Sequence, residues 1–277
     1  MHRASANGEQ YHIACRKGDL AEYLLVPGDP ERVDKIAKLW DSAKKVSDHR
    51  EFRSLTGKYK GIPVSALSSG IGPACMSIAV NEAASVGVHI FIRVGSTVAR
   101  STVAIQENIE CGDLIFSSAA VRLDGTSNCY IMPEYPAVAS FEVLQALIEA
   151  AESLGIKNYH VGITATTADF YAGQSRHTTA SYQSSTENLL SLLKRAKVLN
   201  FEMETATLFT LASLYGLRAG SVCTVFANRC RNEFRTGAGE ENAIMVANEA
   251  IKILREWDKK KMREEKRWLF PLLVNTR

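Results

Sequence analysis

The chain has 277 residues, 46% of them hydrophobic, and its formal net charge is +3. This length and apolar content are enough for a sizeable buried core, in one large α/β domain or two small ones. The small net charge argues against a nucleic-acid-binding protein, since such proteins carry a clear excess of basic residues.

Short apolar runs bounded by glycine or aspartate predict strands along the chain, and several of the intervening segments show apolar residues at helical spacing. The predicted strands are Tyr23–Val26, Ile62–Leu67, His89–Val94, Leu114–Phe116, Tyr159–Thr164 and Ala219–Phe226. The predicted helices are Ala74–Val86, Phe141–Leu154, Glu187–Arg195, Glu202–Tyr215 and Glu240–Trp257. Strands followed by helices indicate a largely parallel sheet that is covered on both faces.

No linker rich in serine, glycine or proline interrupts this pattern, and no repeat or low-complexity segment occurs. We therefore expect one domain over residues 1–277, with its core at about 11–257. Residues 258–277 are expected to form the end of a C-terminal helix and a tail. Their basic residues are interrupted by Glu264 and Glu265, which indicates a solvated helix end.

The six cysteines are scattered, without a C-x-x-C pair or another metal-ligand spacing. That usage is typical of free thiols in a reducing compartment. The N-terminus is polar and lacks the apolar stretch of a signal peptide. The uncharged segment 61–81 contains too much glycine, serine and proline for a membrane span. We expect a soluble, cytoplasmic protein with neither a membrane nor a nucleic acid as partner.

Two arginines stand near predicted strand ends, the edge where open α/β sheets bind their ligands. Gly28 follows the first strand, and Arg32 lies in the first turn of the next helix. A cation there is unfavourable for the helix dipole unless an anion lies between them. Arg93 interrupts an apolar strand, where a charge must be paired, and Ser96 follows it. The combination of an arginine, a hydroxyl group and a glycine backbone favours a phosphate site. The alternatives are that Arg32 lies on the surface and that Arg93 forms a structural ion pair.

Glu202 and Glu204 open a predicted helix whose following residues are mostly apolar. Acidic residues at a helix start are common partners of the helix dipole, which is the simplest interpretation. Glu204, however, leads into a core-facing segment, so its carboxylate needs partners. A carboxylate is also suited to binding the two vicinal hydroxyls of a ribose.

Gln174 and Arg176 lie two residues apart, close to the aromatic Phe170. In an extended segment such residues point to the same side, so both side chains can converge on one small planar ligand. Glutamine offers a donor and an acceptor, whereas arginine offers only donors. This combination fits the edge of a uracil base; a solvated pair on a polar loop is the alternative.

Taken in chain order, these segments resemble the uridine phosphorylases of the nucleoside phosphorylase-I superfamily, from about Tyr11 to Ile253. The resemblance rests on Gly28-Asp-Pro-Glu-Arg32-Val33, His49-Arg-Glu-Phe52, Ser69-Gly-Ile-Gly72, Ile92-Arg-Val-Gly95, Val121-Arg-Leu-Asp-Gly125, Phe170-Tyr-Ala-Gly-Gln-Ser-Arg176, Glu202-Met-Glu204 and Asn228-Arg229. It implies a three-layer α/β/α sandwich with a central mixed, partly barrel-like sheet. It also implies a pentosyltransferase of pyrimidine salvage, which converts uridine and phosphate reversibly into uracil and ribose 1-phosphate without an organic cofactor.

The resemblance further implies a role for each matching residue, in a site shared between the subunits of a homodimer or an assembly of dimers. Phosphate would be bound by Gly28, Arg32, Arg93 and Ser96, with Arg50 from the neighbouring subunit. Ribose would be bound by Met203, Glu204 and the neighbour's His12. Uracil would be bound by Phe170, Gln174, Arg176 and Arg229. The residues that would act in catalysis are Arg93, Gln174, Arg176 and Glu204.

Two departures from the family's pattern bear on this expectation. The family's Thr-Thr-Gly-Ala run after the strand arginine is Ser96-Thr-Val-Ala99 here, and Val98 removes backbone freedom. Some bacterial members bind a monovalent cation at the dimer axis through a glutamate, matched by Glu51, and a serine, which is Cys75 here. A thiol is a poor ligand for a hard cation, so a metal would depend on two Glu51 side chains meeting at the axis.

The choice of base follows from one loop. Purine-cleaving relatives carry an aspartate there to protonate N7 of the base, whereas this chain has Asn228-Arg229. The resemblance therefore favours a pyrimidine. The alternatives are a purine nucleoside phosphorylase or a methylthioadenosine-type nucleosidase on the same fold, and a nucleoside-binding protein without catalysis.

Overall fold

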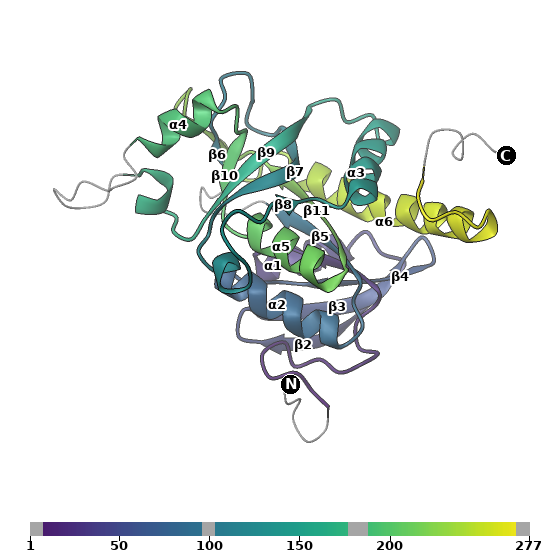
Figure 1. The fold of residues 1–277 in the computed structure, drawn as a ribbon. Helices are drawn as coiled ribbons and strands as arrows, with labels where there is room; N and C mark the ends of the chain where they lie inside the picture. The colour runs from purple at the N-terminus through teal and green to yellow at the C-terminus, as the bar shows by residue number, and fades with distance from the viewer. Residues whose placement is uncertain (1–7, 96–102, 177–187, 270–277) are drawn as a thin grey trace.

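The computed structural model describes residues 8–95, 103–176 and 188–269. In these residues thirteen strands form one sheet, and six α-helices lie around it (Figure 1). The helices are α1 Pro30–Ala37, α2 Pro73–Ser85, α3 Phe141–Ser153, α4 Leu189–Arg195, α5 Thr205–Tyr215 and α6 Glu240–Arg263. The strands are β1 Tyr23–Val26, β2 Ser42–His49, β3 Phe52–Tyr59, β4 Ile62–Leu67, β5 Ile90–Gly95, β6 Val103–Ala104, β7 Leu114–Leu123, β8 Ala137–Val138, β9 Tyr159–Thr167, β10 Asn200–Glu202, β11 Arg218–Thr224, β12 Ala227–Asn228 and β13 Glu233–Phe234.

The sheet is mixed. Its strand order is β13-β12-β6-β10-β9-β7-β11-β5-β1-β4-β3-β2, and β8 pairs with β7. The central strands β4, β1, β5 and β11 run parallel to one another, whereas β11 and β7 are antiparallel. The predicted mixed sheet is therefore confirmed, and in the described part of the chain it does not close into a barrel.

Helices cover both faces of the sheet. Neighbouring residues of a strand point to opposite sides, so the apolar strands present side chains to a core on each face. Leu25 and Ile92 belong to the core that α1, α3 and α6 complete. Leu24 and Phe91 belong to the core on the other face, which α2 and α5 complete. Figure 1 shows α2 and α5 in front of the sheet and α6 passing behind it. The three-layer α/β/α sandwich is confirmed; the assignment of all 277 residues to one domain stays a prediction.

Most predicted elements occur close to their predicted bounds. β1 and β4 have those bounds, while β7 and α6 continue beyond Phe116 and Trp257. Glu187, the predicted start of one helix, lies outside the described residues. No helix in the described ranges has the length and apolar character needed to cross a membrane.

The predicted helix start at Glu202 is wrong. Glu202 is the last residue of β10, where it pairs with Thr166 of β9, and α5 begins at Thr205. The Glu202 carboxylate accepts hydrogen bonds from the backbone N–H groups of Glu204 (2.8 Å) and Thr205 (2.9 Å). It therefore satisfies the unpaired donors at the start of α5 from the end of a strand.

The carboxyl ends of β1 and β5 lie side by side, with Val26 paired to Arg93. The turn that contains Gly28 leaves β1 at this point, so it begins next to Arg93. Ligands of open α/β sheets bind at such an edge, and the candidate site is found there.

Candidate functional site

Arg32 is held in the core by the start of α1. Asp29 caps this helix by accepting a hydrogen bond from the N–H of Glu31 (2.9 Å), and Pro30 takes the first helical position, where its missing N–H costs nothing. The Arg32 side chain is fully buried, and its Nε donates to Glu240 Oε1 at 2.7 Å. Its Nη1 and Nη2 have no hydrogen-bond partner in the described part of the chain.

Arg93 lies near the end of β5 and is 1% exposed. Its Nε is 3.1 Å from Glu202 Oε2, and its Nη2 forms an ion pair with Glu204 Oε2. The structural ion pair considered for this residue is therefore present, and it is double. Even so, Nη1 has no hydrogen-bond partner among the described residues.

The charge of Arg93 acts on the buried guanidinium of Arg32. Burial lowers the pKa of Arg32, and the positive charge of Arg93 lowers it further, while Glu240 raises it. Burial also works against the charge of Arg93, but Glu204 and Glu202 outweigh it and raise the pKa of that group above its usual range. Buried polar atoms are normally hydrogen-bonded, so neighbouring cations with unpaired N–H groups form an arrangement that an anion would complete.

Gly28 brings a second backbone segment close to this place. A Cβ atom at Gly28 would lie 3.2 Å from the carbonyl oxygen of Gly70, so a larger residue would press the two segments apart. Gly70 itself has φ of +74°, in the region that favours glycine. Ser96, the hydroxyl predicted for the same site, lies outside the described residues.

Glu204 joins the arginine cluster to α2. It is 3% exposed, and its Oε1 accepts a hydrogen bond from the N–H of Gly72 at 2.6 Å. Burial raises the pKa of Glu204, Arg93 lowers it, and the nearby Glu202 raises it again. Met203 is also buried, and its methyl group would lie 4.0 Å from a Cβ at Gly72. The structure therefore places Met203 and Glu204 together, next to Arg93.

The predicted base-binding residues form a second cluster. Arg176 lies with its guanidinium 4.2 Å from the centre of the Phe170 ring, and its Nη2 is 3.5 Å from Gln174 Oε1. Gln174 is fully buried, and its Nε2 has no hydrogen-bond partner in the described ranges. Arg229 donates to the carbonyl oxygens of Gln174 and, at 2.9 Å, of Ser175. All four predicted residues are thus brought together.

The geometry behind this convergence differs from the prediction. Gln174 ends a 3₁₀ turn, Ala172–Gln174, and Ser175 has a left-handed backbone with φ of +53°. The segment is therefore not extended. The side chains of Gln174 and Arg176 meet because the backbone reverses between them.

Residues 22–257 match the protein-family model described as the phosphorylase superfamily. The chain belongs to this superfamily. The uridine phosphorylase of Thermococcus kodakarensis is 58% identical over 265 residues, which cover 95% of this chain and 93% of that protein. The uridine phosphorylase of Escherichia coli is 40% identical over 259 residues, 91% of this chain and 97% of that protein. A guanosine phosphorylase of Halorubrum lacusprofundi is 36% identical over 220 residues, 79% of this chain and 84% of that protein.

Two residues that the phosphorylase resemblance assigns to a neighbouring subunit do not contact the site within one chain. His12 Nδ1 lies 2.6 Å from Glu82 Oε1, and Arg50 is exposed with its guanidinium 5.6 Å from the centre of the Tyr11 ring. No contact in the described part joins either residue to Arg93. Their role across a dimer interface stays a prediction.

The side chains at the expected cation position do not fit a metal within one chain. Cys75 Sγ donates to Glu51 Oε1 at 3.5 Å. Burial, the hydrogen bond to Glu51 and its charge raise the pKa of Cys75 to about 11, so the thiol stays protonated at neutral pH and is no strong ligand. The described residues contain no group of three metal-binding side chains. A cation between two copies of Glu51 stays a prediction.

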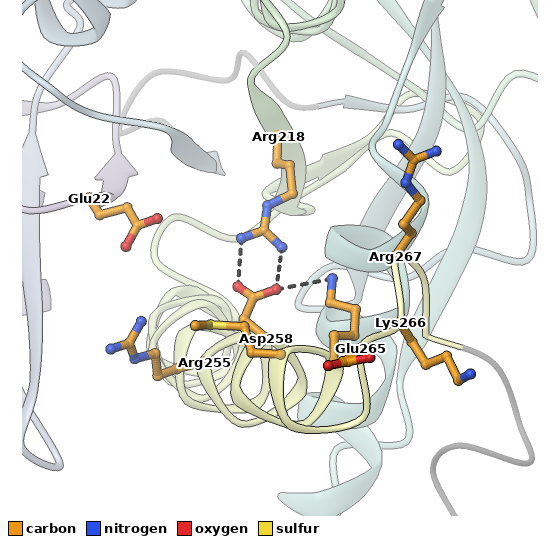
Figure 2. A pocket seen from close by; sticks show the side chains of 9 residues that line it. Glu22, Arg218, Arg255, Asp258, Glu265, Lys266 and Arg267 are labelled. Carbon is orange, nitrogen blue, oxygen red and sulfur yellow. Dashed lines mark hydrogen bonds and ion pairs between the residues drawn. The ribbon is translucent and has the colours of Figure 1, made fainter.

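The sequence reasoning missed two acidic residues, Glu202 in its observed role and Glu240, which hold the arginines. Glu240 lies in the first turn of α6, where an acid is common, and Glu202 was predicted at a helix start. Neither position therefore carried a clear signal. A separate pocket of about 510 Å³ lies beside α6, where Arg218 pairs with both oxygens of Asp258 at 2.6 and 3.0 Å (Figure 2). Lys261 lies 3.0 Å from the same carboxylate. The central charges of that pocket are thus satisfied, unlike those of the candidate site.

Proposed function

We propose that this protein catalyses the reversible phosphorolysis of uridine to uracil and ribose 1-phosphate. The observation that carries the proposal is the pair of buried arginines, Arg32 and Arg93, which keep Nη atoms without a hydrogen-bond partner in the described residues. Relatives named uridine phosphorylase support the substrate, at 58% and 40% identity over most of the chain.

Phosphate fits between the arginines because it is an anion with several acceptor oxygens, and guanidinium groups bind such oxygens in their fork geometry. Gly28, at the turn after β1, would add its own backbone N–H, and the dipole of α1 favours an anion near the start of that helix. The hydroxyl of Ser96 is expected to contribute from the segment after β5.

Glu204 and Met203 would hold the ribose. Glu204 is already oriented by Arg93 and by the N–H of Gly72, so its carboxylate can accept from the ribose hydroxyls without further rearrangement. Met203 offers an apolar surface beside it. This arrangement would place C1′ within reach of the phosphate.

The reaction needs two developing charges to be stabilised. As the bond between C1′ and N1 of uracil breaks, its electrons move to the base, and positive charge builds on the ribose. A phosphate oxygen stabilises that charge and then forms the new bond to C1′. Gln174 and Arg176 would donate hydrogen bonds to the uracil anion, and fixed donors aimed at developing charge are a large source of catalysis.

A pyrimidine is favoured over a purine by the loop after β11. Asn228 is 1% exposed, and its amide donates to the carbonyl oxygens of Gln106 and Ile109 at 2.9 and 2.5 Å. The Arg229 guanidinium is occupied by the carbonyls of Gln174 and Ser175. Neither residue is an acid that could protonate a purine N7.

A panel of nucleosides tests this choice. Purified protein in phosphate buffer is expected to release base from uridine with a kcat/KM on the order of a hundredfold above that for inosine, guanosine or methylthioadenosine, because only a pyrimidine matches the Gln174–Arg176 donors. Products are measured by chromatography under identical conditions. A preference for inosine or guanosine would replace uridine by a purine nucleoside as the substrate.

The proposed working unit is a dimer in which His12 and Arg50 complete the partner's site. Arg50→Ala and Arg93→Ala are each expected to be inactive alone. In a mixed dimer, one site contains both substitutions and the other contains neither. Equal mixing with random exchange makes half of the dimers mixed, so roughly a quarter of the wild-type activity is restored. Mass measurement confirms the exchange. Activity that stays at the parental background in confirmed mixed dimers would mean that Arg50 acts within its own chain.

A further inference from the structure

Each of the two buried arginines has a carboxylate from a distant element beside its Nε. Glu240, in the first turn of α6, accepts from Arg32 Nε at 2.7 Å. Glu202, at the end of β10, lies 3.1 Å from Arg93 Nε. Arg32 Nε is hydrogen-bonded, whereas Arg93 Nε makes an ion-pair contact without a hydrogen bond. Both Nη atoms of Arg32 and Nη1 of Arg93 have no hydrogen-bond partner within the described residues.

Glu202 has no capacity left for a substrate. It is fully buried. Its Oε2 forms the ion pair with Arg93 and accepts hydrogen bonds from the backbone N–H groups of Glu204 and Thr205. Its Oε1 accepts from the hydroxyl of Thr166. The carboxylate therefore fixes the arginine and the backbone of Glu204 as one unit.

Glu240 is shared between two cations on α1. Its Oε2 accepts from Lys35 Nζ at 2.8 Å, on the opposite oxygen from Arg32. Lys35 is 41% exposed, whereas Arg32 is fully buried. Of the two contacts of the Glu240 carboxylate, the one with Arg32 is thus the buried one.

We propose that Glu202 and Glu240 are positioning residues that aim Arg93 and Arg32 at the phosphate, an inference that rests on the proposed function. The hydrogen bond to Glu240 restricts rotation of the Arg32 guanidinium, and the ion pair with Glu202 favours one orientation of the Arg93 guanidinium. Two carboxylates close to an anion site repel the anion. They benefit phosphate binding only through the placement of the arginines.

The two effects of each carboxylate, repulsion of the anion and placement of the arginine, predict opposite changes in phosphate affinity when the carboxylate is removed. If the arginines stayed in place, removing a carboxylate would tighten phosphate binding, because one repulsive charge is gone. If the carboxylate positions the arginine, its removal weakens phosphate binding instead. Direct titration of phosphate by calorimetry distinguishes the two results, and it does not require turnover.

For Glu240, the test variant is Glu240→Ala and the matched control is Lys35→Met, which removes the partner on the other oxygen. Glu240→Ala is expected to raise the Kd and KM for phosphate about tenfold or more, with the KM for uridine changed less than about threefold. Lys35→Met is expected to leave all three constants within about twofold. Unchanged or tighter phosphate binding in Glu240→Ala would overturn the role of Glu240.

For Glu202, the test variant is Glu202→Ala and the matched control is Thr166→Val, which removes the bond to Oε1 but leaves Oε2 in place. Glu202→Ala is expected to weaken phosphate about tenfold or more, whereas Thr166→Val lowers Tm with phosphate affinity within about threefold. Glu202→Gln keeps an oxygen facing Arg93 and is expected to restore affinity to within about threefold of wild type.

Glu202→Ala removes a buried cap as well as a charge, so Glu202→Gln and the Glu240 variants provide the test if it does not fold. Phosphate affinity in Glu202→Gln that falls as far as, or further than, that in Glu240→Ala would overturn positioning by hydrogen-bond geometry. Failure of the proposed function gives a different result: the wild-type protein would not release uracil, while the variants could still be compared by phosphate titration.

Discussion

Arg93→Ala is expected to lower kcat/KM for uridine phosphorolysis by on the order of a thousandfold, the loss typical of removing one fixed charge-stabilising donor. Arg93 would contact phosphate through Nη1, and it also orients Glu204 through an ion pair. Its removal therefore affects both halves of the sugar–phosphate site. Steady-state kinetics with varied phosphate and uridine measure the loss.

Breaking a buried ion pair also costs stability, about 3–5 kcal/mol when one partner is removed. The assay temperature has to lie below the Tm of the variant, determined by calorimetry. Arg218→Ala is the matched control, because it breaks the Arg218–Asp258 pair on β11 and α6, away from the site (Figure 2). Its kcat/KM is expected to stay within about twofold of wild type. Equal losses in both variants would mean that Arg93 acts through stability alone.

Arg176→Ala is expected to lower kcat/KM for uridine by about a hundredfold to a thousandfold, equivalent to about 3–4 kcal/mol of transition-state stabilisation. The guanidinium lies between the Phe170 ring and the Gln174 amide, where a uracil anion would develop. Since Arg176 takes no part in the arginine pair at Arg32 and Arg93, the Kd for phosphate should change little. The kinetic constants and a phosphate titration are measured on the same preparation.

Arg176→Lys is a useful companion variant. It keeps the positive charge but loses the planar fork of donors, so it should recover only part of the lost activity. Full recovery would show that Arg176 acts as a charge without directed hydrogen bonds. Near-normal uridine turnover in Arg176→Ala would place the base pocket elsewhere.

Local patterns were sufficient to predict the inner strands of the sheet. β1 and β4 are short apolar runs with clear turn residues at their ends, and both have the predicted bounds. The β2–β3 hairpin was not predicted. β2 has the sequence Ser-Ala-Lys-Lys-Val-Ser-Asp-His and is exposed along most of its length, so it lacks the apolar alternation on which strand prediction depends.

The site was predictable in its residue types but not in its pairings. A charge at the end of an apolar strand and an acid at a core-facing helix start each require a partner, and the structure joins these two residues, Arg93 and Glu204. Glu240, by contrast, lies 208 residues from Arg32. Such a contact depends on how α1 and α6 pack on the sheet, which no local pattern reports.

The contact between Gln174 and Arg176 was predicted for the wrong reason. An extended segment would have aligned them, but the backbone forms a 3₁₀ turn followed by a left-handed residue, Ser175. Serine in this conformation has no strong sequence signature, since glycine and asparagine are the usual residues there.

The dependence of uracil release on phosphate tests the central claim most directly. Purified wild-type protein is incubated with uridine after exhaustive removal of phosphate, with and without added phosphate, and uracil and ribose 1-phosphate are quantified by chromatography. We expect uracil only when phosphate is present, with ribose 1-phosphate formed in equal amount, because the buried pair of Arg32 and Arg93 is proposed to bind the attacking anion. Uracil release at the full rate without phosphate, with free ribose as the second product, would contradict the account and make the protein a hydrolase.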